Sequence, residues 1–140
     1  MDLNPHAGDW TYELADYCLS QNTDTLLLCN AWLDSGENDE EDTDLYTVKY
    51  WAARLRPLWD YNDSTNRDIT VILCNRTGTE KGKWTQRREL LLLSTTLRVT
   101  DSTFAGSSTL FKMTSGLGQP VVLDALTKEE ELLEVWNINV

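Results

Sequence analysis

Two short apolar segments that end alike dominate the pattern of this chain of 140 residues. Residues 25–29 and residues 69–74 are each followed by asparagine, so that both segments close on Cys-Asn. A short apolar run is typical of a strand buried on both sides, as in a parallel sheet. Neighbouring parallel strands place their carboxyl ends at one edge, where α/β proteins hold their sites. The repeat therefore predicts that Asn30 and Asn75 lie at one edge, either lining a pocket mouth or only opening a turn.

Helices are expected on either side of the first strand. Asp9 can cap a helix over residues 9–20. Residues 45–59 carry apolar side chains at intervals of three and four, which is the pattern of an amphipathic helix. Pro57 should end or kink this helix, because proline lacks the N–H donor and crowds the preceding turn.

The second half of the chain reads as consecutive strands. Residues 109–113 and 121–126 predict an antiparallel hairpin, and residues 132–140 predict a final strand. Strands that alternate with helices and are then followed by further strands indicate an α/β fold with a mixed sheet.

Charge and composition exclude several classes of protein. Twelve Lys and Arg stand against 23 Asp and Glu, giving a net charge of −11. Phosphate backbones and anionic lipid would repel such a chain, so we expect neither nucleic acid nor a membrane as partner. We find no apolar run long enough to span a bilayer and no signal-peptide pattern at Met1. These features indicate a cytoplasmic or nuclear protein.

Residues 34–44 form an acidic stretch with seven carboxylates and no basic residue. The simplest interpretation is a solvated loop with no buried carboxylate, because like charges repel. A calcium loop is the alternative, but the spacing does not match an EF-hand.

The chain offers few residues for catalysis or metal binding. Cys18, Cys29 and Cys74 form no close pair in sequence and are interpreted as buried, inert thiols. His6 is the only histidine, and we interpret it as a surface residue, with a Cys-His pair as the alternative. A zinc site is not expected. No metal or organic cofactor is implied.

Five short motifs stand in a recognisable order. They are Met1-Asp2-Leu3-Asn4-Pro5, Leu28-Cys29-Asn30-Ala31-Trp32, Trp51-Ala52-Ala53-Arg54, Cys74-Asn75-Arg76-Thr77-Gly78-Thr79-Glu80 and Phe104-Ala105-Gly106-Ser107-Ser108. This order resembles the second half of the nitrilase, or carbon–nitrogen hydrolase, superfamily, closest to the fungal protein N-terminal amidases. The resemblance implies that residues 1–140 are a partial carbon–nitrogen hydrolase domain. Its fold would be the C-terminal part of an α-β-β-α sandwich, with helices on one face of the sheet.

The resemblance also implies a reaction, the deamidation of amino-terminal Asn or Gln of proteins. Enzymes of the family use a Glu, Lys and Cys triad, in which the thiolate attacks the amide carbon and water hydrolyses the thioester. Aligned on the family, the nucleophile would immediately precede Met1, and the Glu and Lys would lie further upstream. We therefore assign no catalytic residue to this chain and expect it to be inactive alone.

The resemblance implies that this chain supplies one wall of the substrate pocket. Met1, Asp2, Asn30, Trp32 and Asn75 fall on or beside the family's substrate-lining segments. The alternatives are structural: a turn before a helix for Asp2, turns for the two Asn residues, and ordinary core for Trp32.

Residues 84–102 depart from the family pattern, which passes almost directly from Asn-Arg-Thr-Gly-Thr-Glu to Phe-Ala-Gly-Ser-Ser. We interpret them as translated intron, with Met1 an internal methionine. Transcripts that join the codons of Lys83 and Thr103 would support this, and full-length transcripts through the segment would contradict it. The alternative is a genuine surface insertion.

Two other functions remain open. A non-catalytic homologue would act by association, because half of a sandwich leaves an uncovered apolar face and unpaired strand edges, so a homo-oligomer is one expectation. A member of the superfamily could instead act on a nitrile or another small amide.

Overall fold

The computed structural model describes residues 11–34, 36, 42–60, 67–82 and 101–136. Its main element is a four-stranded mixed sheet of order β1-β2-β5-β6. The strands are β1 (Thr25–Asn30), β2 (Asp68–Asn75), β5 (Thr109–Thr114) and β6 (Val121–Ala125). β1 and β2 are parallel, whereas β5 is antiparallel to both β2 and β6. The predicted α/β class with a mixed sheet is confirmed, as are the parallel pair and the hairpin.

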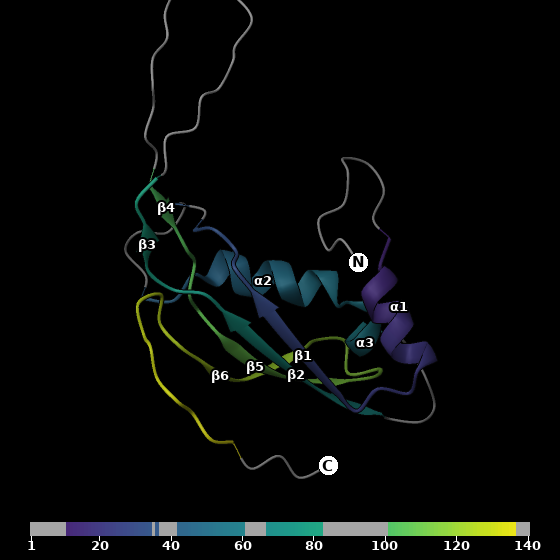
Figure 1. Cartoon of the computed structure of the whole chain (residues 1–140). Helices are drawn as coiled ribbons and strands as arrows, with labels where there is room; N and C mark the ends of the chain where they lie inside the picture. Colours follow the sequence, from purple (N-terminus) through teal and green to yellow (C-terminus); the bar gives the residue numbers. More distant parts are fainter. Residues whose placement is uncertain (1–10, 35, 37–41, 61–66, 83–100, 137–140) are drawn as a thin grey trace, which may run out of the picture.

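Three helices cover one face of this sheet (Figure 1). They are α1 (Glu13–Ser20), α2 (Leu45–Arg54) and α3 (Pro57–Asp60). The expected helix over residues 45–59 is thus divided just before Pro57, as the missing N–H donor predicts. The expected cap Asp9 lies outside the described residues, and α1 begins at Glu13 after Tyr12.

The core lies between the helices and the inner face of the sheet. Its fully buried side chains come from β2, β5 and both later helices: Leu55, Leu58, Ile69, Val71, Phe111 and Met113. Burial of this apolar surface is the main source of stability for the layered arrangement.

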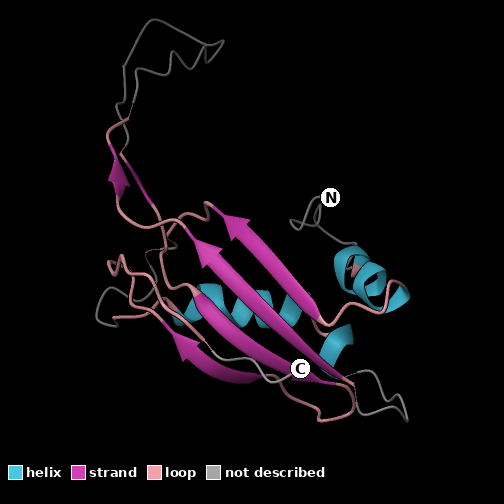
Figure 2. Cartoon of the chain, turned by 60° about the horizontal axis from the view of Figure 1, so that its bottom comes forward, coloured by secondary structure: helices cyan, strands magenta, loops and turns pink. Residues whose placement is uncertain are grey.

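Among the residues that the structure describes, no helix lies on the opposite face of the sheet (Figure 2). For this reason the prediction that residues 25–29 and 69–74 are buried on both sides is wrong. Leu27 is 59% exposed, whereas β2 alternates, with Ile69, Val71 and Leu73 buried and the residues between them more accessible. The sequence of a continuous apolar run does not distinguish a strand covered on one face from a strand covered on both faces.

Two further expectations concern the later part of the chain. The strand expected over residues 132–140 is absent from residues 132–136, which have no regular secondary structure, and residues 137–140 lie outside the described residues. A small antiparallel ladder joins β3 (Thr79–Glu80) to β4 (Ser102–Thr103). The ladder brings together the two flanks of the atypical segment 84–102, of which residues 84–100 lie outside the described part.

Among the described residues, no helix combines the length and apolar character that crossing a bilayer requires.

Candidate functional site

The carboxyl ends of β1 and β2 meet at one edge of the sheet. Asn30 and Asn75 are register partners there, as the repeated Cys-Asn predicts. Side chains paired in this way project to the same face of a sheet. This face is the one that carries the helices, because Leu73, two residues before Asn75, belongs to the core.

The side chain of Asn75 links three segments of this edge. Its Oδ1 accepts the backbone N–H of Trp32 at 2.9 Å, and its Nδ2 donates to the carbonyl of Gly106 at 2.9 Å. The backbone N–H of Asn75 donates to Oγ of Ser108 at 3.0 Å. Both ends of the Asn75 amide are therefore engaged with backbone, which makes this residue a positioning residue at the edge.

Asn30 differs from Asn75 in its hydrogen bonding. Its backbone carbonyl accepts the N–H of Arg76 at 3.0 Å, but its buried Nδ2 has no hydrogen-bond partner among the described residues. A buried amide donor without an acceptor is uncommon and destabilising. Asn30 is thus a candidate donor to the oxygen of a bound group.

Trp32 forms an aromatic cluster with two residues of α2. Its ring stacks on Tyr50 with centroids 5.0 Å apart and meets Trp51 edge-on at 5.4 Å. Trp51 is 2% exposed, and its indole Nε1 has no hydrogen-bond partner within the described ranges. A second buried donor therefore lies beside Trp32.

Residues 104–108 close the edge from the side of β5. The N–H of Ala105 donates to the carbonyl of Trp32 at 2.9 Å, and that of Gly106 donates to the carbonyl of Arg76 at 3.0 Å. Gly106 has φ +53°, and a Cβ there would lie 2.1 Å from the carbonyl oxygen of Lys128. Only glycine fits this close approach without a backbone shift.

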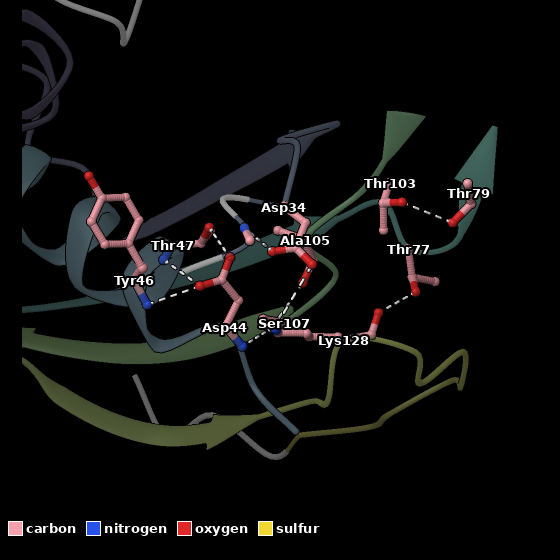
Figure 3. Close-up of polar contacts among 11 residues, drawn as sticks. Asp34, Asp44, Tyr46, Thr47, Thr77, Thr79, Thr103, Ala105, Ser107 and Lys128 are labelled. Carbon is pink, nitrogen blue, oxygen red and sulfur yellow. Dashed lines mark hydrogen bonds and ion pairs between the residues drawn. The ribbon is translucent and has the colours of Figure 1, made fainter. Parts of the chain in front are cut away.

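A polar network supports this segment from the start of α2 (Figure 3). Asp44 is 1% exposed, and its carboxylate accepts the N–H groups of Tyr46 and Thr47 at 3.0 and 3.2 Å. Its own N–H donates to Oγ of Ser107 at 2.8 Å. Helix N-termini stabilise carboxylates in this way.

The expectation that no carboxylate of residues 34–44 is buried is therefore wrong at Asp44. The side chain of Asp34 is also partly buried, and its Oδ2 lies 3.9 Å from Nζ of Lys128. Residues 35 and 37–41 lie outside the described part. The sequence signal for this cap is an aspartate directly before a segment whose apolar residues recur with helical periodicity.

The edge brings together three of the five residues that the sequence singles out. Asn30, Trp32 and Asn75 lie there, whereas Met1 and Asp2 fall outside the described residues, as does His6. Trp51 and Gly106 were not anticipated, although both belong to motifs of the family resemblance. No group of three metal-ligating side chains occurs in the part of the chain that the structure describes.

Comparison with known proteins gives no relative for this chain: no family model, no curated protein and no solved structure matches it.

Proposed function

We propose that this chain forms one wall of the site of a carbon–nitrogen hydrolase that deamidates amino-terminal Asn or Gln. The single observation that carries the proposal is the meeting of four of its five motifs at one edge. Trp32 binds Asn75 and Ala105 through its backbone and contacts Trp51 through its ring. Motifs dispersed over 81 positions, from 28 to 108, thus meet where α/β folds place their sites.

The chemistry of the edge suits an uncharged amide ligand. Asn30 Nδ2 and Trp51 Nε1 are buried donors without acceptors among the residues that the structure describes. A carbonyl oxygen of a bound amide could accept a hydrogen bond from either donor and remove the cost of leaving it unpaired. The aromatic rings of Trp32 and Tyr50 would pack against the apolar part of the ligand.

The covalent steps would come from residues that the resemblance does not assign to these 140 positions. A thiolate would attack the side-chain amide carbon, ammonia would leave, and water would hydrolyse the thioester. In this proposal the chain itself binds and orients the substrate and carries no triad residue.

Ligand binding can be tested by nitrogen–proton NMR of the full chain with short peptides that begin with Asn. We expect the indole signal of Trp51 and the side-chain signal of Asn30 to shift. The indoles of Trp59 and Trp136 are internal controls, because they already donate to Ala52 and Asp124. Equal shifts of all indoles, no shift at saturating peptide, or the same response to peptides that begin with Asp would contradict the proposal.

The reaction can be tested by fusing the chain to an upstream segment that carries the Glu, Lys and Cys triad. We expect ammonia release from peptides that begin with Asn or Gln, and none from the chain alone. Activity confined to nitriles or other small amides would move the chain to another substrate class of the superfamily. Enzymatic ammonia release by the chain alone would contradict the proposed division of roles.

A second candidate function, association without catalysis, is favoured by exposed apolar surface on β1, at the border of the sheet. Leu27 on β1, which projects to the face opposite the helices, is 59% exposed. Uncovered apolar surface of this kind marks many association sites. If this face mediates self-association, Leu27→Lys should shift sedimentation toward the monomer, whereas Leu117→Lys, at a 51% exposed position in the turn before β6, should not. Identical sedimentation of the two variants would argue against this role.

A further inference from the structure

Two of the three cysteines lie side by side on the uncovered face of the sheet. Cys29 and Cys74 are register partners in the parallel strands β1 and β2, and both are exposed. They precede Asn30 and Asn75, which project toward the helices, so the two thiols project to the opposite face. The expectation that all three cysteines are buried and inert is wrong for this pair.

The spacing of paired strands suits a covalent link between these residues. Neighbouring strands lie about 4.8 Å apart. Disulfides join Cα atoms that are about 4.4–6.8 Å apart. The Cα atoms of two cysteines in register on adjacent strands therefore have a separation within the disulfide range.

The third cysteine differs from this pair in its burial. Cys18 lies on α1, is 2% exposed and belongs to the core. Burial raises its pKa, which disfavours the thiolate that reacts with disulfides. The pKa of Cys74 is also raised, by partial burial and by the neighbouring Cys29. The strand register, which makes Cys29 and Cys74 partners, is what places the two thiols side by side.

We propose that Cys29 and Cys74 are a reversible dithiol–disulfide pair that takes up oxidising equivalents from low-molecular-weight disulfides. One thiolate of the pair attacks a sulfur of the small disulfide, forms a mixed disulfide and releases a small thiolate. The other cysteine loses its proton and attacks the protein sulfur of the mixed disulfide, which releases the second small thiolate. The two protein thiols lose two electrons and two protons, and the small disulfide is reduced to two thiols.

A disulfide between Cys29 and Cys74 would constrain the edge of the sheet where the carboxyl ends of β1 and β2 meet. It joins β1, which lies at one border of the sheet, to the interior strand β2. It lies one residue before Asn30 and Asn75, so oxidation would fix the two carboxyl ends relative to each other. Exposed bridges are also the ones most readily reduced, which favours reversibility. None of these steps depends on the proposed amidase function.

The test treats the full native chain with oxidised glutathione, quenches with an alkylating agent and measures intact mass before and after dithiothreitol. We expect the loss of two hydrogen atoms, restored by the reductant, and a peptide map that links the peptides of Cys29 and Cys74. After denaturation one alkylatable thiol, that of Cys18, should remain. A bridge that includes Cys18, or covalent dimers in place of the internal bridge, would overturn the proposal.

Single variants separate pair chemistry from ordinary surface reactivity. Cys29→Ser and Cys74→Ser should each stop at the mixed disulfide, with the added mass of one glutathione and no internal bridge. Cys18→Ala is the matched control and should form the bridge as the wild type does. A wild-type protein that accumulates the same stable mixed disulfide as the two serine variants would overturn the proposal.

A trivalent arsenical provides a second measurement, because phenylarsine oxide requires two neighbouring thiols. The wild type and Cys18→Ala should bind one equivalent, and both serine variants should lose this binding. Equal binding by all four proteins would contradict the pairing of Cys29 with Cys74.

Discussion

The side-chain Oδ1 of Asn75 accepts the backbone N–H of Trp32 at 2.9 Å, across the carboxyl edge of two parallel strands. Its Nδ2 donates to the carbonyl of Gly106, so one amide joins the ends of β1 and β2 to the segment that enters β5. The candidate site is therefore held together by a side chain that the family resemblance assigns to substrate lining. Positioning and lining are distinguishable by experiment.

Replacement of Asn75 should weaken the fold as well as any binding. Asn75→Ala removes two hydrogen bonds and leaves the N–H of Trp32 unpaired, so we expect a loss of about 1–3 kcal/mol in the free energy of unfolding. Urea unfolding followed by tryptophan fluorescence measures this. Gln119→Ala, at an exposed position, is the control and should have almost no effect. Equal midpoints for the two variants would refute the positioning role.

Gly106 should tolerate no side chain, for a reason separate from its backbone conformation. Alanine at a left-handed position costs about 1–2 kcal/mol. At Gly106 the added Cβ would also meet the carbonyl of Lys128, and such overpacking costs about 1–3 kcal/mol more. Gly118 has φ +75° with nothing within 4 Å, so Gly118→Ala carries only the first cost. The difference between the two variants in thermal unfolding gives the free-energy cost of the clash. Equal losses of stability would mean that the backbone at Lys128 shifts away from the added Cβ without a measurable cost.

Asp44 should stabilise α2 although it lies in the acidic stretch. Asp44→Ala removes the cap of α2 and the acceptor of the Thr47 hydroxyl. We therefore expect a loss of about 0.5–2 kcal/mol in the free energy of unfolding. Asp42→Ala makes the same change in net charge at an exposed position. If relief of charge repulsion dominated, both variants would be stabilised in chemical denaturation.

Asp68 should make part of the stability sensitive to acid. Its hydrogen bonds with Lys112 and Thr114 lower the pKa of the carboxyl group below 3.8. A folded-state pKa below the unfolded value contributes stability that is present above the unfolded pKa and is lost as pH falls through the folded pKa. Asp68 is half exposed, so the contribution is small and screened by salt.

The comparison of wild type with Asp68→Asn in urea shows this contribution directly. The wild type should be the more stable at pH 6, and the difference should shrink as pH falls below 3.8, the ordinary pKa of aspartate. Lys112→Met should reduce the same difference, because Lys112 is the largest cause of the shift. A difference that grows in acid would reverse the assigned sign.

Several elements were accessible from sequence because their causes are local. Pro57 breaks the helical pattern by its own covalent structure, and the helix ends before it. The repeated Cys-Asn predicted that Asn30 and Asn75 lie at one edge, because neighbouring parallel strands place their carboxyl ends together, and the two residues are register partners there. The hairpin of β5 and β6 follows from two apolar runs around a glycine-containing turn.

Other properties depended on what packs against each element. Cys18 and Cys29 were both interpreted as buried thiols, but Cys18 on α1 packs into the core whereas Cys29 on β1 is exposed. Asp44 is buried because a helix terminus supplies two N–H donors to its carboxylate. The donors of Asn30 and Trp51, which have no acceptor in the described part of the chain, became visible only when packing had buried them.

Local chain chemistry thus determined that the helical pattern stops before Pro57, that β1 and β2 end at one edge, and which residue types reach that edge. The tertiary structure decided which side chains are covered, that the side-chain amide of Asn75 is engaged with backbone while Nδ2 of Asn30 has no partner among the described residues, and that Cys29 and Cys74 are exposed. The reason is physical: a residue's covalent nature acts on its neighbours in the chain, whereas burial and pairing depend on layers that come from distant segments.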